Sequence, residues 1–340
     1  MSERGPAAGR SRPAAPTSDP VRAIADAVLY EGYVLWPYRR SALKNAQRWT
    51  FGGVYPRAHS AGRAPGDDAC AMQTQCLLEA TEEARVSVDV RFLQVVHRQA
   101  ADRDGRPVDA LVGAAGEPGY LTWDEALERE LALPPTPLCE LADGERLELA
   151  IAAGRAEERL AAGALVRSWE ALAGSVTLRA QQLEPALHVL TVRIENDTPW
   201  KGGPREELMR RTLCSTHTEL DVEGGAFVSL TDPPGWLSSV AAACENVGTW
   251  PVLVGEEGAR DRLLSSPIVL SDYPRVAPES PGDLFDGGEI DQLLILNVLA
   301  LTDAEKEEAR GSDPRVRELL ERTESLSPEQ LMRLHGAVRR

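Results

Sequence analysis

Long hydrophobic runs are missing from this sequence of 340 residues. No stretch reaches the roughly 18 consecutive apolar residues that a membrane-spanning helix requires. The first 20 residues also lack the apolar core of a secretory signal. We therefore expect a cytoplasmic protein with no membrane span.

Cysteine is scarce as well. The five cysteines are odd in number, scattered along the chain and never spaced as Cys-x-x-Cys. Disulfide frameworks are typical of small secreted domains with many cysteines. The pattern instead indicates reduced thiols, in agreement with a cytoplasmic location.

Sequence motifs that are diagnostic of a particular catalytic activity are also absent. The sequence has no Gly-x-Ser-x-Gly elbow, and none of its Gly-Gly pairs opens a phosphate-binding loop. The five histidines do not lie in a recognisable catalytic motif; they are His59, His97, His188, His217 and His335. We therefore expect a protein that is not an enzyme and has no cofactor, although active sites need not be local in sequence.

The composition is that of a globular protein, with 43% hydrophobic and 26% charged residues. The net charge of −16 is unevenly distributed. Residues 1–65 contain ten Arg or Lys and four acids, a balance of +6, which leaves −22 for the remainder. Because an acidic body repels a phosphate backbone, we expect no nucleic-acid binding.

Residues 86–92 alternate between apolar and polar side chains, which predicts a half-buried strand. The same alternation returns at 147–151, 176–178 and 190–194. Strands separated by Gly, Asp and Pro favour antiparallel pairing in a sandwich or curled sheet. The expected fold class is α+β: an antiparallel β-sandwich-like lobe followed by a smaller α+β lobe with C-terminal helices.

The expected domain organisation has three parts. Residues 1–20, rich in Pro, Ala, Arg and Ser, form a disordered leader. Residues 21–200 form the β-rich lobe, and the turn-like run at 197–204 leads into the α+β lobe at 201–340. A helix is expected from Val21, and Ala- and Glu-rich residues predict helical insertions at 123–133 and 155–165.

The second lobe has its own expected elements. A helix is predicted at 206–211 and another from the Pro233-Pro234 pair toward Cys244. Strands are predicted at 226–230, 251–255 and 267–270. Capping boxes at Thr302 and Ser327 indicate the C-terminal helices.

An aromatic and cationic segment occupies residues 30–57 and contains seven of the seventeen aromatic residues. Tyr, Trp and Arg side chains anchor protein interfaces because they bury large areas and keep a polar group. The candidate partner-binding residues are Tyr33, Trp36, Tyr38, Arg39, Arg40, Lys44, Asn45, Arg48 and Trp49. The alternatives are that these aromatics cover an edge of the β lobe, or that they line a small-ligand pocket.

An acidic segment at residues 272–291 carries six carboxylates among Pro and Gly residues. Hard cations prefer oxygen ligands of this kind, and Cys214 with His217 has the Cys-x-x-His spacing that begins some zinc sites. The candidate metal ligands are Asp283, Asp286, Glu289, Asp291, Cys214 and His217. Alternatively, the carboxylates form a solvated loop or pair with the cationic segment, and Cys214 is a buried strand residue.

Four sequence strings resemble an uncharacterised family of accessory proteins encoded beside nickel–iron uptake hydrogenases in actinomycetes and related bacteria. They are Leu29–Arg57, Ser215–Pro234, Cys244–Gly255 and Ser265–Asp291, about a quarter of the chain. The resemblance implies a role in assembling, maturing or supporting a hydrogenase and brings no catalytic residues.

The sequence leaves three hypotheses about function. The leading one is a non-enzymatic accessory or scaffold protein that supports hydrogenase assembly or maturation through contacts with a protein partner, a hydrogenase subunit or another maturation factor. The second is a metal-dependent enzyme or metallochaperone that uses the acidic loop or the Cys-x-x-His pair. The third is a homo-oligomer whose two oppositely charged segments join neighbouring copies.

Overall fold

The computed structural model describes residues 20–30, 52–64, 66–112 and 119–275, together with residues 302, 303, 306, 317, 320, 321, 324 and 325. Its strands are β1 (Ala71–Ala101), β2 (Pro107–Val108), β3 (Ala110–Leu111), β4 (Tyr120–Leu121), β5 (Trp123–Pro137), β6 (Glu145–Ile151), β7 (Gly154–Leu160), β8 (Gly163–Trp169), β9 (Leu172–Glu184), β10 (Leu187–Asn196), β11 (Cys214–Val228), β12 (Trp250–Leu253) and β13 (Arg262–Ser266). The helices are α1 (Pro20–Tyr30), α2 (Arg57–Ser60), α3 (Arg205–Met209), α4 (Ser238–Ala242) and the 3-10 turn η2 (Leu138–Glu140).

One antiparallel sheet of eleven strands dominates the described residues, with the order β12-β13-β11-β1-β10-β9-β6. Off this path, β2, β5 and β8 pair with β1, and β7 pairs with β8. The expected antiparallel β structure is thus confirmed. β11–β13 follow residues 197–204 in sequence and yet pair into the same sheet as β1. The expected boundary therefore does not separate two sheets.

β1 is the central element, because its 31 residues pair with β2, β5, β8, β10 and β11. Residues 71–79 pair with β10, whereas residues 85–98 pair with β5. The β1–β11 register shifts between Ala80 and Arg85. Irregularities of this kind bend a strand, and β1 thereby passes from one half of the sheet to the other.

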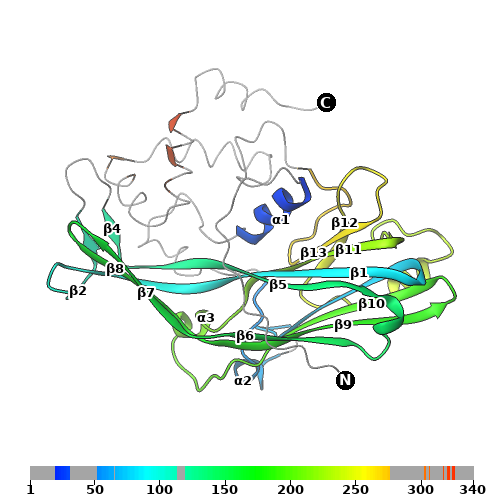
Figure 1. Cartoon of the computed structure of the whole chain (residues 1–340), viewed down its shortest axis with the longest axis horizontal. Coiled ribbons are helices and arrows are strands. Elements are labelled where there is room, and N and C mark those ends of the chain that lie inside the picture. Colours follow the sequence, from blue (N-terminus) through cyan, green and yellow to red (C-terminus); the bar gives the residue numbers. More distant parts are fainter. Residues whose placement is uncertain are drawn as a thin grey trace.

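The main hydrophobic core lies between the two halves of this sheet. The alternating residues Val86, Val88, Val90 and Phe92 of β1 are fully buried in it, as the sequence pattern predicts. Side chains of β6, β9 and β10 pack in the same cluster. In Figure 1 these three strands lie below β1 and β5, while α1 lies above them on the opposite face.

The helices expected at 123–133 and 155–165 are wrong. Residues 123–137 form β5, whose inward side chains include Leu131 and Leu133 in the main core. Residues 154–169 form the β7–β8 hairpin, in which Leu160 pairs with Gly163 across a two-residue loop. Helix propensities differ by only a few tenths of a kcal/mol per residue, about 0.7 at most for ordinary residues, so long pairing with β1 outweighs them.

The remaining expected elements have mixed outcomes. The helix from Val21, the helix near 206–211 and the strand near 251–255 are confirmed as α1, α3 and β12. The strand expected at 267–270 is wrong, since β13 occupies 262–266 and ends before Pro267. The leader and most of the C-terminal helices lie outside the described residues. No described helix combines the length and the apolarity needed to span a bilayer.

Candidate functional site

Gly52, near the end of the aromatic and cationic segment, is the point at which the chain joins the sheet. Its backbone has a φ of 57°, in the left-handed region that favours glycine. The carbonyl of Gly52 accepts a 3.0 Å hydrogen bond from the Thr216 amide. A Cβ at this position would lie 2.7 Å from Cγ of Pro267. The site therefore requires a residue without a side chain.

Segments that are distant in sequence converge around Gly52. Val54 forms a bridge with Leu213, just before β11. Pro267 follows β13, and Gly248, which precedes β12, lines the same pocket as Gly52. We call this meeting point of residues 52–54, 213–216, 248–249 and 265–267 the Gly52 junction.

A buried cluster of hydroxyl groups holds the junction together. Thr74 of β1 donates a 2.7 Å hydrogen bond to Ser265 Oγ, and Thr249 Oγ1 lies 2.8 Å from the same oxygen. Ser265 is fully buried, and Thr74 and Thr249 are nearly so. Since buried hydroxyls are costly unless they are hydrogen-bonded, this network fixes β1, β13 and the segment before β12 relative to one another.

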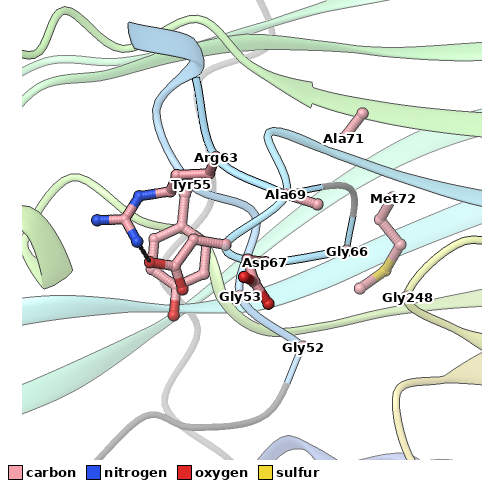
Figure 2. A pocket seen from close by; sticks show the side chains of 11 residues that line it. Gly52, Gly53, Tyr55, Arg63, Gly66, Asp67, Ala69, Ala71, Met72 and Gly248 are labelled. Atoms are coloured by element: carbon pink, nitrogen blue, oxygen red, sulfur yellow. Dashed lines mark ion pairs between the residues drawn. The ribbon is translucent and has the colours of Figure 1, made fainter. Parts of the chain in front are cut away.

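A polar pocket of about 400 Å³ opens beside Gly52. Its lining residues are Gly52, Gly53, Tyr55, Arg63, Gly66, Asp67, Asp68, Ala69, Ala71, Met72 and Gly248. Figure 2 shows Tyr55 and Arg63 on one side of the pocket, Met72 and Gly248 on the other and Asp67 between them. Residues 52–72 therefore form most of the pocket wall.

Asp68 organises the side of the pocket that carries Tyr55. Its carboxylate lies 2.8 Å from Nε2 of His59 and 3.6 Å from Nη1 of Arg63. Burial opposes ionisation of Asp68, but hydrogen bonds from His59 and Tyr55 outweigh it, so the pKa of Asp68 is lowered. Burial raises the pKa of Tyr55 to about 12. Asp68 is thus ionised and Tyr55 is a neutral hydrogen-bond donor at physiological pH.

A second unusual cluster lies beneath α1, on the sheet face opposite the main core. Arg91 of β1 is only 1% exposed, and its guanidinium lies 2.5 Å from Asp26 of α1 and 3.5 Å from Glu219 of β11. Arg22 of α1 pairs with Glu130 of β5 at 2.6 Å. We call these groups, with Asp89, Glu128 and His217, the α1 charge cluster. It joins α1 electrostatically to three strands.

The α1 charge cluster has more carboxylates than guanidiniums, and the pKa values of two of its carboxyl groups are raised. Burial raises the pKa of Glu219 to about 7, despite the attraction of Arg91 and Arg22. Burial and the neighbouring carboxylates of Glu130 and Asp221 raise the pKa of Asp89 to about 6. Strong shifts of this kind mark functional sites in many proteins but also occur in structural ion-pair networks.

His217 is fully buried at the edge of this cluster. Burial and the nearby Arg91 charge lower its pKa to about 3, so the imidazole is neutral. Its Nδ1 lies 3.2 Å from the carbonyl oxygen of Ser215. Its Nε2 has no hydrogen-bond partner within the part of the chain that the structure describes.

The candidate metal ligands have two different outcomes. Cys214 packs in an apolar cluster with Leu93 and Tyr55. No group of three His, Cys, Asp or Glu residues suited to a metal ion occurs among residues 20–30, 52–64, 66–112, 119–275 and the few described positions beyond. The Cys214–His217 pair therefore gains no further ligand there. The carboxylates Asp283, Asp286, Glu289 and Asp291 lie outside the described residues.

The candidate partner-binding residues, Tyr33 to Trp49, also lie outside the described residues. The flanks of their segment are described, and both are anchored on β11: α1 through the Arg91–Glu219 cluster, and Gly52 through Thr216.

Sequence reasoning missed the partners of two histidines. His59 is paired with Asp68, and His97 Nδ1 lies 2.8 Å from Asp124, which also accepts a hydrogen bond from Arg210. The nine-residue separation of His59 and Asp68 is a signal that a loop could have brought them together. His97 and Asp124 are opposite each other only through the β1–β5 register, and the helix that the sequence predicts at 123–133 does not contain that register.

Comparison with known proteins identifies no family, because no family model and no curated protein matches this chain.

Replacing Gly52 by alanine is expected to lower the free energy of unfolding by about 2 kcal/mol, because the left-handed backbone and the Pro267 contact both oppose a Cβ. Gly62→Ala is the matched control, since Gly62 also has a positive φ, 85°, but nothing within 4 Å of the added Cβ. It should cost only about 1 kcal/mol. Chemical denaturation measures both, and equal losses would contradict a tight junction at Gly52.

Proposed function

We propose that this chain is a non-enzymatic cytoplasmic accessory protein that supports assembly or maturation of a nickel–iron hydrogenase by binding a protein partner. The observation that carries the proposal is the Gly52 junction. Gly52, Thr216, Gly248 and Pro267 belong to the four different strings that resemble hydrogenase-associated accessory proteins, and they meet at one place.

The meeting of these four strings at one place indicates that the resemblance reflects a common binding site and not only a common sheet. Other long stretches of the sheet, such as β6, β9 and β10, lie outside the four strings although they build much of the main core. If the strings resembled that family only because they build the sheet, similar strings would be expected across β6–β10 as well. Residues gathered around one pocket are instead expected where a protein meets a ligand or partner.

Anchoring of the aromatic and cationic segment supports a protein partner in particular. α1 leads into the segment and is held by the α1 charge cluster, while Gly52, near the end of the segment, is held by Thr216. The segment's Tyr, Trp and Arg side chains are those that dominate binding energy in protein interfaces. Both flanks of that segment are thus tied to β11, and Gly52 also lines the pocket.

Exposed apolar side chains near the junction add a second argument. Val247 and Trp250 flank the pocket residue Gly248 and are 43% and 36% exposed. Val269, two residues beyond Pro267, is 78% exposed. Single exposed apolar residues are ordinary, but three that lie within two residues of Gly248 or Pro267 in sequence support an interaction surface here.

Affinity purification from cells that express the chain together with the hydrogenase gene cluster tests the proposal. The tagged protein should recover a hydrogenase subunit or maturation factor, and the double variant Trp36→Ala, Arg40→Ala should recover at least about ten-fold less, which corresponds to 1.4 kcal/mol.

The control variant is Trp236→Ala, Arg146→Ala, which removes the same residue types from exposed positions outside the junction. Its recovery should equal that of the unchanged protein. If the chain is recovered alone, or only with copies of itself, the proposed function is wrong.

A further inference from the structure

We propose that the pocket beside Gly52 binds a basic side chain, an arginine or a lysine, presented by the protein partner. This inference rests on the proposed function for the source of that side chain. Its physical basis is the charge of the pocket wall, which carries two carboxylates, Asp67 and Asp68, and one guanidinium, Arg63.

The two carboxylates are not equivalent. Asp68 already has His59, Tyr55 and Arg63 around it, so its charge is largely compensated within the protein. Asp67 is exposed on the pocket wall, and within the described part of the chain it has no ion pair and no side-chain hydrogen bond. The pocket therefore presents one uncompensated negative charge to an incoming group.

An anionic ligand would be disfavoured by the charges of the pocket wall. Its charge would be repelled by Asp67, and Arg63, the cation of the pocket wall, is already 3.6 Å from Asp68. Glycine-rich walls often receive phosphates through backbone amides, but those sites are not lined by adjacent carboxylates. Charge complementarity thus selects a cation.

The surroundings favour a cation carried by a polypeptide over a free metal ion. The volume of about 400 Å³ is in the range of pockets for organic groups. Tyr55 and Met72 in the pocket wall offer apolar contacts to the aliphatic part of a long basic side chain.

Titration of the full-length protein with N-acetyl-arginine methylamide, followed by amide chemical shifts in NMR, tests the pocket directly. Shifts are expected at Asp67, Gly248 and their neighbours, and they should weaken as salt is added. Asp67→Asn should reduce the affinity by about five-fold, whereas Asp143→Asn, a control at an exposed turn before β6, should leave it unchanged.

N-acetyl-glutamate methylamide is the probe of opposite charge. If it binds as well as the arginine probe, or if Asp67→Asn leaves arginine binding unchanged, the assignment of the pocket to a basic side chain is overturned. The lysine analogue should bind at the same residues, since both carry a positive charge.

Partner recovery separates this inference from the proposed function. If no partner is recovered but the arginine probe binds through Asp67, the proposed function fails and the preference of the pocket for a basic group stands. If a partner is recovered equally by the unchanged protein and Asp67→Asn, and the probe does not bind, the pocket assignment fails and the proposed function stands.

Discussion

Replacing Arg91 by leucine is expected to lower the free energy of unfolding by about 3–5 kcal/mol at pH 7.5, because it leaves the buried Glu219 carboxylate and the half-buried Asp26 carboxylate with only the more distant Arg22, 3.7 Å from each, as a counter-charge. Arg91 is 1% exposed and is paired with Asp26 and Glu219, two groups that would remain in place. Denaturation by urea, followed by tryptophan fluorescence, measures the loss.

The control for Arg91 is Arg146→Leu, which removes an exposed ion pair with Glu148. Exposed pairs contribute only about 1 kcal/mol or less. If Arg91→Leu does not fold at pH 7.5, the measurement is repeated at pH 5, where Glu219 is protonated and the variant should recover part of its stability. A loss at pH 7.5 no larger than that of Arg146→Leu would contradict the role assigned to Arg91.

Replacing Glu219 by glutamine is expected to remove much of the pH dependence of stability between pH 4.5 and pH 7. The pKa of Glu219 is about 7 in the folded protein, above its ordinary value of 4.5. The folded state therefore binds more protons than the unfolded state in this interval, and stability falls as the pH rises through it.

The size of this effect follows from the pKa shift. One pKa unit corresponds to about 1.4 kcal/mol, so the rise of the Glu219 pKa from 4.5 to about 7 means that ionising Glu219 costs the folded protein about 3 kcal/mol by pH 8. Glu219→Gln should equal the unchanged protein near pH 5 and exceed its stability at pH 8. Asp89, with a pKa of about 6, should leave a smaller residual slope.

Denaturation midpoints at pH 5, 6, 7 and 8 measure the Glu219 effect. Glu148→Gln is the control, since the Glu148 side chain is 60% exposed and its removal should leave the slope unchanged. Parallel pH profiles for Glu219→Gln and the unchanged protein would show that the Glu219 carboxyl does not cause the pH dependence of stability.

The strands could be predicted from the sequence where one face of the sheet is apolar. Val86, Val88, Val90 and Phe92 alternate with polar residues and lie in the main core. The prediction failed for β5, because its core face includes the charged residues Glu125 and Arg129 among leucines. Charged residues on both faces hide a period of two, and the Ala, Glu and Leu content then indicates a helix.

The candidate site could be predicted only in part. The sequence marks residues 30–57 as unusual, and their last members, Gly52 to Arg57, lead into the Gly52 junction. It does not reveal the α1 charge cluster, because Asp26, Arg91 and Glu219 are far apart in sequence and meet only when α1, β1 and β11 are assembled. The local sequence signal for this cluster is Arg91 itself, a charged residue placed between Val90 and Phe92 in an alternating strand.

The many partners of β1 also bear on how the chain folds during synthesis. β1 ends at Ala101, but its neighbour β11 begins at Cys214, more than a hundred residues later. At about 5–20 residues per second, the ribosome needs roughly 5–20 s to supply that neighbour. During this interval the long strand β1, one face of which is apolar, has an unpaired edge, so we expect newly made chains to depend on chaperones until β11 emerges.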